Sequence, residues 1–429
     1  MRTIRVPGDK SMSQRALMLS ALATGESRLR GVLPSDDPCA TAGALRALGV
    51  DLPSLPGDGS EIRVQGVGLR GLKEPVGVLD FENSGTGSRL MLGVLAAQSF
   101  TTRATGDASL RGRPMGRITR PLAQMGATFH ELGEADRLPL EVVGSQLRSL
   151  DYDSPVASAQ VKSALLFAGL AGETFVLVSE PRCSRDHTER MFGMVGASVV
   201  SHENGGRWHV ELRDPPSSIH PLDFEVPGDF SSASFLVALA LLGGVEGGLA
   251  IDHVGLNPTR TGFLGVLARM GGRVDLVGAP MVGEPTGGLR ATSAILTGTE
   301  VGEAEVPGMI DEFPILAVVA ARAEGVTRIT GASELRVKES DRIRALAYNL
   351  RAVGVEVEEL EDGLEIVGSD RPLEGAVSSR HDHRIAMAFG ILGALPGNRI
   401  EVEGSSVVDV SFPGFWTLLA DLTSGKAGS

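Results

Sequence analysis

A repeated strand–turn–helix unit constrains the fold of this chain more than any other sequence feature. Val6-Pro7-Gly8-Asp9 returns as Val226-Pro227-Gly228-Asp229, and more loosely as Val306-Pro307-Gly308-Met309. Each turn leads into a helix rich in Ala, Leu or Met. Related turns lie near Leu79, Asp153 and Ser379. The chain therefore holds six units, spaced by roughly 70–80 residues, which is a longer period than solenoid repeats have.

The first unit indicates how each one is built. The alternating run Thr3–Val6 is typical of a strand, and Pro7-Gly8 ends it in a turn. The run Ala16–Ala23 is apolar on nearly all sides and predicts a buried helix, with Ser11 or Ser13 as its N-cap.

A second helix follows in each unit, and it ends in Gly before a β-branched strand. Gly is the usual residue just past a helix end. In five units this residue is Gly49, Gly126, Gly196, Gly271 and Gly354. A further strand often closes the unit, so each unit is read as β–α–β–α–β–β, with the sixth cut short. Such alternation predicts a layered α/β fold.

The six units divide into three plus three at the full repeat of Val226. A length of 429 residues also favours two domains over one core. The formal net charge of −13 argues against binding to nucleic acid or an anionic membrane. No signal peptide or membrane-spanning run is visible, so we expect a cytoplasmic protein. Two cysteines are too few for a disulfide framework or a zinc site.

Candidate site residues gather at the starts of the first helices. In the N-terminal half, Lys10, Ser11 and Arg15 surround a strand-to-helix turn, where backbone N–H groups attract anions. Capping and solvated charges would explain the same residues. The Gly-rich turn Asn83–Arg89 and the arginine-rich segment Arg111–Arg117 leave a similar choice between an anion site and an ordinary loop.

The third unit adds Ser158, Gln160 and Lys162 at a helix start, followed by the charged segment Arg185–Arg190. Cys183 is a conceivable nucleophile, although an inert buried thiol is the simpler interpretation.

The C-terminal half carries carboxylates among cations. Asp311-Glu312 opens an apolar helix, and a carboxylate there can serve the helix dipole or act as a base. Lys338, Glu339 and Arg342 lie within one helical turn, which also fits a solvated helix face. The segment His381–Arg384 invites a metal site, but no third ligand cluster accompanies it. Pseudo-symmetric domains would bring these helix starts into one cleft for two anionic small molecules.

The chain resembles the EPSP synthase family, the enolpyruvyl transferases of the shikimate pathway. The similarity runs from Val6 to about Phe415 and depends on several motifs in order. They are Pro7–Ser11 with Arg15, Asn83–Thr86, Arg113–Gly116, Ser158–Gln160, Arg185–His187, Asp311, Arg336–Glu339 with Arg342, and Asp382–Arg384.

The resemblance implies a two-domain inside-out α/β barrel with three βαβαββ repeats per domain and the active site in the cleft between domains. Residues 1–9 with 227–429 would form one domain, and 10–226 the other. The implied reaction moves the enolpyruvyl group of phosphoenolpyruvate to the 5-hydroxyl of shikimate 3-phosphate, without metal or cofactor, in a monomer.

By position, the resemblance also implies roles for single residues. Asp311 would take the hydroxyl proton, Glu339 would protonate the enol methylene, and Lys10 and Lys338 would stabilise developing charge. The shikimate 3-phosphate contacts would be Lys10, Ser11, Arg15, Ser158, Ala159, Gln160, Arg185, Asp311 and Lys338. The phosphoenolpyruvate contacts would be Lys10, Gly85, Arg113, Gln160, Arg342 and Arg384.

Some residues depart from the family pattern. Many relatives have Ser in place of Asp9 and Ala159, and many have a Lys before the run Ser411-Phe412-Pro413, which is absent here. One cation on the phosphoenolpyruvate side is therefore missing or supplied elsewhere. The main alternative is the sister enzyme that uses UDP-N-acetylglucosamine, but no Cys lies near Arg111–Arg117, where its reactive thiol is expected. A non-catalytic relative of the fold is a second alternative.

Overall fold

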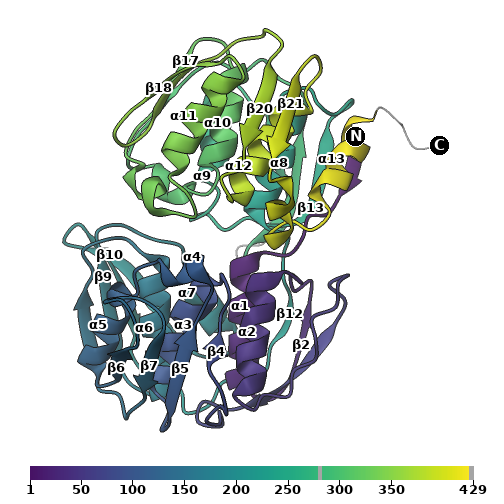
Figure 1. Cartoon of the computed structure of the whole chain (residues 1–429). Helices are drawn as coiled ribbons and strands as arrows, with labels where there is room; N and C mark the ends of the chain where they lie inside the picture. The colour runs from purple at the N-terminus through teal and green to yellow at the C-terminus, as the bar shows by residue number, and fades with distance from the viewer. Residues whose placement is uncertain (279–282, 425–429) are drawn as a thin grey trace. The chain divides into compact units, whose positions relative to one another are not determined.

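A computed structural model describes residues 1–278 and 283–424 (Figure 1). The chain divides into two compact units. Unit 1 contains Met1–Pro7 and the chain from Pro227 onward, and unit 2 contains Gly8–Val226. The chain therefore changes unit between Pro7 and Gly8, two residues before the expected position, and again between Val226 and Pro227.

Unit 2 contains three helix–strand repeats. Its helices are α1 (Lys10–Leu22), α2 (Asp36–Ala47), α3 (Gly85–Ala96), α4 (Ala108–Arg111), α5 (Gly116–Met125), α6 (Ala159–Gly172) and α7 (His187–Met194). Its strands are β2 (Thr24–Arg30), β3 (Ile62–Val67), β4 (Leu79–Asp80), β5 (Thr101–Thr105), β6 (Thr128–Glu131), β7 (Leu140–Val143), β8 (Leu150–Asp153), β9 (Val176–Glu180), β10 (Val200–Asn204), β11 (Arg207–Leu212) and β12 (Asp223–Glu225).

Unit 1 repeats this plan. Its α-helices are α8 (Phe230–Leu241), α9 (Gly262–Arg269), α10 (Phe313–Arg322), α11 (Arg342–Ala352), α12 (His383–Gly393) and α13 (Phe415–Thr423), with 3₁₀ turns η1 (Val306–Gly308), η2 (Ser333–Val337) and η3 (Ser405–Val410). Its strands are β1 (Arg2–Ile4), β13 (Leu249–Gly255), β14 (Val274–Val277), β15 (Thr286–Ala291), β16 (Glu300–Val301), β17 (Val326–Ile329), β18 (Glu356–Glu359), β19 (Leu364–Val367), β20 (Glu374–Ser378) and β21 (Arg399–Glu403).

The sheets confirm the predicted alternation of helices and strands. Four sheets have the same strand pattern, in which two parallel strands are followed by two antiparallel ones: β4-β5-β7-β6, β8-β9-β11-β10, β1-β13-β15-β14 and β16-β17-β19-β18. The first and sixth repeats are smaller, with the sheets β12-β2-β3 and β20-β21. In the first repeat, Asp51 makes only an isolated bridge to Gln65 where the four-stranded sheets have a strand.

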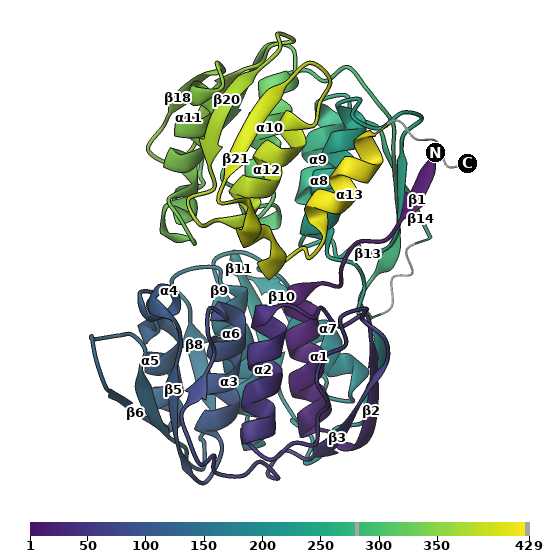
Figure 2. The ribbon, with the colours of Figure 1, turned by 45° about the vertical axis from the view of Figure 1, so that its right-hand side comes forward.

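Two strands are exchanged between the first and fourth repeats. Strand β1 precedes α1 in sequence, yet it pairs in parallel with β13, with Arg2 opposite Leu249. Strand β12 precedes α8, yet it pairs in parallel with β2, with Asp223 opposite Arg28. Figure 2 shows β1 beside β13 at the edge of its sheet. This exchange makes unit 1 discontinuous in sequence.

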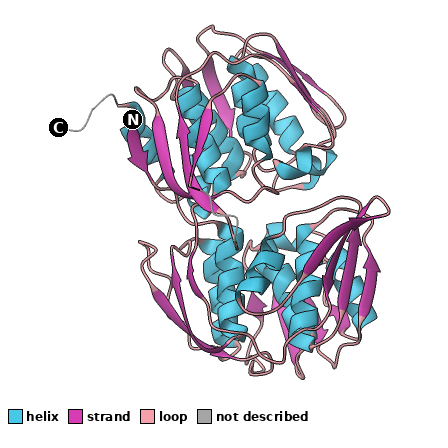
Figure 3. Ribbon diagram, turned by 180° about the vertical axis from the view of Figure 1, so that it is seen from behind, coloured by secondary structure: helices cyan, strands magenta, loops and turns pink. Residues whose placement is uncertain are grey.

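Within each unit, helices lie inside and sheets lie outside (Figure 3). The first helix of every repeat is buried over nearly its whole surface, as the apolar sequences predict. Each unit has its own hydrophobic core. The described strands form six separate sheets and not a closed barrel, so "inside-out" describes the layering while "barrel" does not.

The start of the first helix corrects two local predictions. Helix α1 begins at Lys10, six residues before the expected apolar run, and its N-cap is Asp9, not Ser11 or Ser13. The Asp9 carboxylate accepts a hydrogen bond from the Met12 N–H at 2.8 Å. The preceding strand covers Arg2–Ile4 and not Thr3–Val6. Apolar periodicity located the buried part of the helix but could not include its polar first turn.

The glycines after the second helices behave as predicted. Gly49, Gly126, Gly196, Gly271 and Gly354 all have φ between 86° and 118°. This left-handed conformation ends a helix at little cost only when no Cβ is present.

Candidate active site

Lys10 and Ser11 form the first turn of α1 in unit 2, and both are half-buried. Capping by Asp9 fixes that turn. The Lys10 ammonium lies 3.0 Å from the Asp37 carboxylate, at the start of α2. The helix start thus presents a cation and a hydroxyl beside backbone N–H groups, which suits an anionic group of a small molecule.

Arg15, one turn further along α1, is buried and connects three helices. Its guanidinium donates hydrogen bonds to Thr188 Oγ1 of α7 at 2.8 Å, to Ser163 Oγ of α6 at 3.0 Å and to the Ser11 carbonyl at 3.0 Å. The rigid fork of an arginine suits such a set of acceptors. Arg15 therefore fixes the starts of α1, α6 and α7 relative to one another.

Gln160 and Arg89 connect α6 to α3. The Gln160 carbonyl accepts from Arg89 Nη1 at 2.7 Å, and its amide donates to Thr86 Oγ1 at 3.1 Å. Arg89 is buried, with only 4% of its surface exposed. Sequence reasoning quoted Arg89 as part of a Gly-rich motif but did not assign it to the site, because nothing in the motif separates a site arginine from a surface one.

Gly85 and Arg113 lie together at the start of α3. Arg113 donates to Asn83 Oδ1 at 2.5 Å and to Ser109 Oγ at 3.2 Å. A Cβ on Gly85 would lie 2.9 Å from Arg113 Nη1. The absence of a side chain at residue 85 therefore allows this guanidinium to approach the helix start.

Ser158 caps α6, and Ala159 is its first residue. The Ser158 N–H donates to Glu180 Oε2 at 3.2 Å, and Glu180 Oε1 accepts from the Ser184 N–H at 3.0 Å. Glu180 thus connects the α6 start to the loop that carries the half-buried Arg185.

The buried Lys162 stabilises that loop through ion pairs with residues on both sides of it in sequence. Its ammonium lies 3.0 Å from Glu180 and 2.7 Å from Glu189. Burial opposes the charge on Lys162, but the two carboxylates outweigh it and raise the pKa of Lys162 above its ordinary value. Lys162 is therefore a structural cation, and not an exposed site cation at a helix start.

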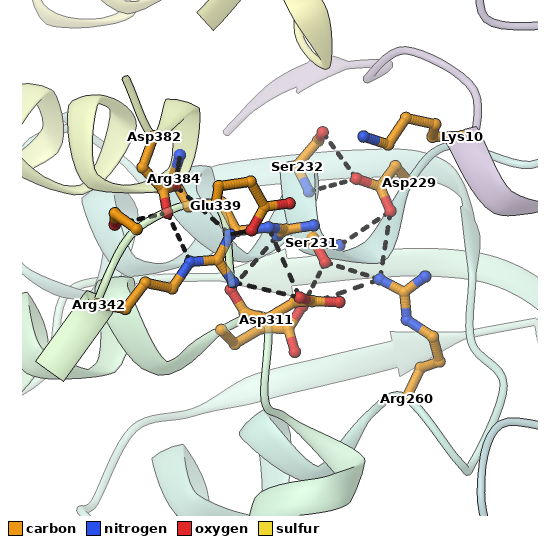
Figure 4. Close-up of polar contacts among 12 residues, drawn as sticks. Lys10, Asp229, Ser231, Ser232, Arg260, Asp311, Glu339, Arg342, Asp382 and Arg384 are labelled. Carbon is orange, nitrogen blue, oxygen red and sulfur yellow. Dashed lines mark hydrogen bonds and ion pairs between the residues drawn. The ribbon is translucent and has the colours of Figure 1, made fainter. Parts of the chain in front are cut away.

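In unit 1, Arg342 is the centre of the acidic and basic residues predicted from the sequence. Its buried guanidinium contacts Asp382 at 2.7 Å, Glu339 at 2.8 Å and Asp311 at 3.5 Å. Arg384 Nε lies 3.7 Å from the same Asp311 oxygen, and its Nη1 donates to the Asp311 carbonyl. Figure 4 shows these side chains converging from the starts of α10, α11 and α12.

Asp382 is a buried anchor for Arg342 and also caps α12. Burial raises the pKa of Asp382, but the Arg342 guanidinium more than offsets this and holds the pKa below its usual value. For Arg342 burial likewise opposes the charge, and Asp382 and Glu339 raise its pKa above normal. The pair therefore stays ionised at neutral pH.

Lys338 follows η2 and is half-buried. Burial lowers the pKa of Lys338 below 10.5, although the Asp311 carboxylate partly offsets the effect. A lysine with a lowered pKa loses its proton more readily than a solvated lysine does. Unit 1 thus brings together two carboxylates of different surroundings, Asp311 and the exposed Glu339, with three cations.

Two other chemistries find little support. Burial raises the pKa of Cys183 to about 11, so its thiol is protonated near neutral pH and is a poor nucleophile. Within residues 1–278 and 283–424, no three His, Cys, Asp or Glu side chains gather closely enough to hold a metal ion. In the same residues, no helix is both long and apolar enough to span a membrane.

Comparisons with known proteins identify the family of the chain. The family model described as EPSP synthase (3-phosphoshikimate 1-carboxyvinyltransferase) matches residues 2–419. The 3-phosphoshikimate 1-carboxyvinyltransferase of Geobacter metallireducens is 48% identical, over 97% of this chain and 95% of that protein. The corresponding protein of Alkaliphilus metalliredigens is 46% identical, over 96% of this chain and 94% of the relative.

Solved structures give the same result. The EPSP synthase of Acinetobacter baumannii has a TM-score of 0.86 at 40% identity, over 98% of this chain and 95% of that one. The enolpyruvyl transferase NikO from Streptomyces tendae has a TM-score of 0.76 at 18% identity, over 98% and 94% of the two chains, which shows a shared fold. By family model, by identity over nearly its full length and by fold, this chain belongs to the EPSP synthase family.

Proposed function

We propose that this chain transfers the enolpyruvyl group of phosphoenolpyruvate to the 5-hydroxyl of shikimate 3-phosphate and releases phosphate. This reaction is a step of the shikimate pathway, which leads to aromatic amino acids. The observation that carries the proposal is the placement of Asp311 and Glu339 on the same buried guanidinium of Arg342, 3.5 and 2.8 Å away. The reaction needs one base and one acid near the same reacting atoms.

Addition is the first step. The oxygen of the 5-hydroxyl attacks the central carbon of phosphoenolpyruvate while Asp311 accepts the proton of that hydroxyl. Glu339 donates a proton to the methylene carbon. A C–O bond and a C–H bond form while the C=C π bond is lost. Lys10 and Lys338 stabilise the negative charge that develops on the substrates.

Elimination is the second step, and it reverses the proton transfers. Glu339, now a carboxylate, takes a proton back from the methyl group, the C=C bond re-forms and the C–O bond to phosphate breaks. The leaving phosphate receives its proton from Asp311. Both carboxyl groups return to their starting states, so the cycle needs no metal or organic cofactor.

The shikimate 3-phosphate contacts are proposed from the resemblance and supported by the hydrogen bonds of each unit. In unit 2, Arg15 ties α1 to α6 and α7, so the residues at those helix starts share one rigid frame. We assign the acceptor substrate to Lys10, Ser11, Arg15, Ser158, Ala159, Gln160, Arg185, Asp311 and Lys338.

Phosphoenolpyruvate carries a carboxylate and a phosphate, and arginines suit both groups. We assign it to Lys10, Gly85, Arg113, Gln160, Arg342 and Arg384. Arg113 beside Gly85 in unit 2, and Arg342 with Arg384 in unit 1, supply the guanidinium groups.

The sister reaction with UDP-N-acetylglucosamine is the weaker candidate. Its reactive cysteine would lie near Arg111–Arg117, but the cysteines are Cys39, in α2, and Cys183, before α7. The high pKa of Cys183 also opposes that role.

We also propose that the enzyme acts as a monomer in the cytoplasm. The apolar helices of each unit are buried in the core of that unit, which leaves no first helix to pair with another chain. Sedimentation of the purified protein tests this state, and a stable dimer at working concentration would contradict it.

Phosphate release tests the proposed reaction. Purified protein is mixed with phosphoenolpyruvate and shikimate 3-phosphate, and the variants Asp311→Asn and Lys338→Ala are measured alongside. We expect release only with both substrates. Asp311→Asn should lower the rate by roughly 10²–10⁴-fold, as removal of a general base does, and Lys338→Ala by roughly 10²–10³-fold, as removal of a charge-stabilising group does. Asp370→Asn changes an exposed carboxylate and should match the wild type.

The outcome separates the candidates. Release with UDP-N-acetylglucosamine, but not with shikimate 3-phosphate, would move the chain to the sister reaction. Absence of release with both acceptors would contradict a catalytic role and favour a non-catalytic relative.

A further inference from the structure

Behind Asp311 lies a buried group of four polar residues, which we call the Arg260 cluster: Asp229, Ser231, Arg260 and Glu312. Arg260 Nη2 donates to Ser231 Oγ at 2.7 Å, and Ser231 Oγ donates to Glu312 Oε1 at 2.5 Å. The same Nη2 lies 3.4 Å from Asp229 and 3.9 Å from Glu312. Figure 4 shows Arg260 reaching this group from the side opposite Arg342.

The cluster is buried and carries more negative than positive charge. Glu312 is 1% exposed, Ser231 1% and Arg260 4%. Arg260 pairs with both carboxylates, and a buried carboxylate is costly unless it is paired and hydrogen-bonded. Apolar residues at these positions would stabilise the core equally well. The three buried charges therefore indicate a role other than packing, and we consider a positioning role.

Glu312 connects the cluster to Asp311. It is the N-cap of α10, and its backbone carbonyl accepts from the Leu316 N–H at 2.9 Å. Its N–H donates to the Met309 carbonyl at 2.9 Å. The backbone of Glu312 is held by hydrogen bonds on both sides, and its carboxylate is held by Ser231. Glu312 therefore fixes the adjacent peptide, and with it the direction in which the Asp311 side chain leaves the backbone.

Arg260 is itself held by the turn that follows β13. Its N–H donates to the Asn257 carbonyl at 2.8 Å, and the Asn257 side chain accepts from the Thr259 N–H at 2.9 Å and donates to Glu284 at 3.2 Å. The guanidinium therefore reaches Ser231 from an ordered turn.

We propose that the Arg260 cluster positions Asp311 for proton transfer. Arg342 and Arg384 attract the Asp311 carboxylate from one side, at 3.5 and 3.7 Å. The cluster fixes it from the other side, through the backbone of Glu312. The proposal rests on the proposed function, since it gives Asp311 the role of base.

Ser231→Ala tests the proposal with the smallest change. It removes the hydroxyl that joins Arg260 to Glu312 and keeps the backbone N–H that Asp229 caps. Misplacement of a catalytic group by a fraction of an ångström lowers kcat while substrate affinity is kept, and we expect a fall of about tenfold in kcat with both KM values within about twofold. Calorimetric titration with shikimate 3-phosphate should give an unchanged Kd.

Ser234→Ala is the matched control. Ser234 lies on the same helix, is equally buried and donates to the Phe230 carbonyl at 2.8 Å, away from Arg260 and Glu312. It should keep kcat within about twofold, because it loses one hydrogen bond of the ordinary structural kind. Glu312→Gln is the second variant, used if Ser231→Ala does not fold, and it should lower kcat with KM retained.

Equal kcat values for Ser231→Ala and Ser234→Ala, with wild-type activity present, would overturn the positioning role and leave the proposed function standing. A raised KM at unchanged kcat would also overturn it, since it would indicate a role in binding. An inactive wild type would instead contradict the proposed function itself.

Discussion

At the scale of single residues, Arg342 and Asp382 decide whether the acid–base group of unit 1 stays assembled. The guanidinium holds three carboxylates, and the Asp382 carboxylate has no exposed surface. Loss of either partner leaves a buried charge without its counterion, which costs more than the pair contributes.

We expect Arg342→Ala to lower the free energy of unfolding by about 3–5 kcal/mol, because Asp382 would be left buried and unpaired. Denaturant unfolding monitored by circular dichroism measures the loss. The double variant with Asp382→Asn should recover much of it, and failure to do so would show that the loss has another source.

The same pair predicts a dependence of stability on pH. The pKa of Asp382 is below its unfolded value of about 3.9, so its contribution is complete above that value and is lost as pH falls through the lower, folded pKa. Wild type should therefore lose stability in this acid range more steeply than Asp382→Asn. Thermal melting between pH 2 and 6 compares them, and parallel curves would contradict the assignment.

Lys338 should set an alkaline limit of activity. Its pKa lies below 10.5 because burial disfavours the ammonium, so the cation is lost at lower pH than in a solvated lysine. Since the proposed role needs the charge, kcat/KM should fall as pH rises through that pKa. Lys338→Arg should move this limb to higher pH, because arginine keeps its charge. An unmoved limb would assign it to another group.

At the scale of elements, the starts of the first helices are where local rules and site chemistry meet. Asp9 caps α1, and Asp229 caps α8 with hydrogen bonds from the N–H groups of Ser231 and Ser232 at 3.3 and 3.1 Å. The Val-Pro-Gly-Asp motif therefore forms the turn, and its Asp caps the buried helix that follows. It also places Lys10 and Ser231 in the first turns of their helices.

Asp9→Ala should lower the free energy of unfolding by about 1 kcal/mol, with an upper range near 2, because the Met12 N–H loses its acceptor. Asp9→Asn keeps an acceptor oxygen and is the control. Chemical denaturation distinguishes them, and an equal loss in both would point to the charge rather than to the cap.

Gly85→Ala tests a close approach at another helix start. The new Cβ would lie 2.9 Å from Arg113 Nη1, a flexible side-chain end, so the guanidinium would shift while the backbone stays. We expect a KM for phosphoenolpyruvate raised by about tenfold, corresponding to roughly 1.4 kcal/mol, with little change in stability. Steady-state kinetics and a thermal melt measure the two effects, and a large fall in melting temperature would show that the helix itself is disturbed.

Much of the fold could be predicted because its information is local. Repeated Val-Pro-Gly-Asp turns, apolar helices and helix-ending glycines each occupy a few adjacent residues. The Arg260 cluster could not be predicted, since Ser231, Arg260 and Glu312 lie far apart in sequence and no sequence motif singles out Arg260. The burial of Lys162 could not be predicted for a similar reason: its partner Glu180 lies on the next strand, so only the folded unit shows that this helix-start cation is buried.

At the scale of the whole molecule, the exchange of β1 and β12 predicts how the chain can be divided. Residues 8–226 retain β12 beside β2 and a complete core of their own. Residues 227–429 lack β1, so the β13 edge of that sheet would be left unpaired.

We expect the fragment 8–226 to fold alone with a cooperative thermal transition, and the fragment 227–429 to be less stable. A version of the second fragment with residues 1–7 joined after its C-terminus should regain stability. Arg2 forms an ion pair with Asp421 of α13, so the two segments to be joined already lie close together. Equal stability of the second fragment with and without β1 would contradict the structural importance of the exchange.

The exchanged strand also has a consequence for synthesis on the ribosome. Unit 2 emerges as one uninterrupted segment and can fold while translation continues, because domains fold as units from the N-terminal side. Strand β1 leaves the ribosome before unit 2 but has no sheet to join until Leu249–Gly255 has been made. For that interval the nascent protein carries an extended segment with unpaired backbone groups, the kind of exposed edge that chaperones shield. Strand β1 is thus translated before unit 2 but reaches its place in a sheet only after unit 2 has been made.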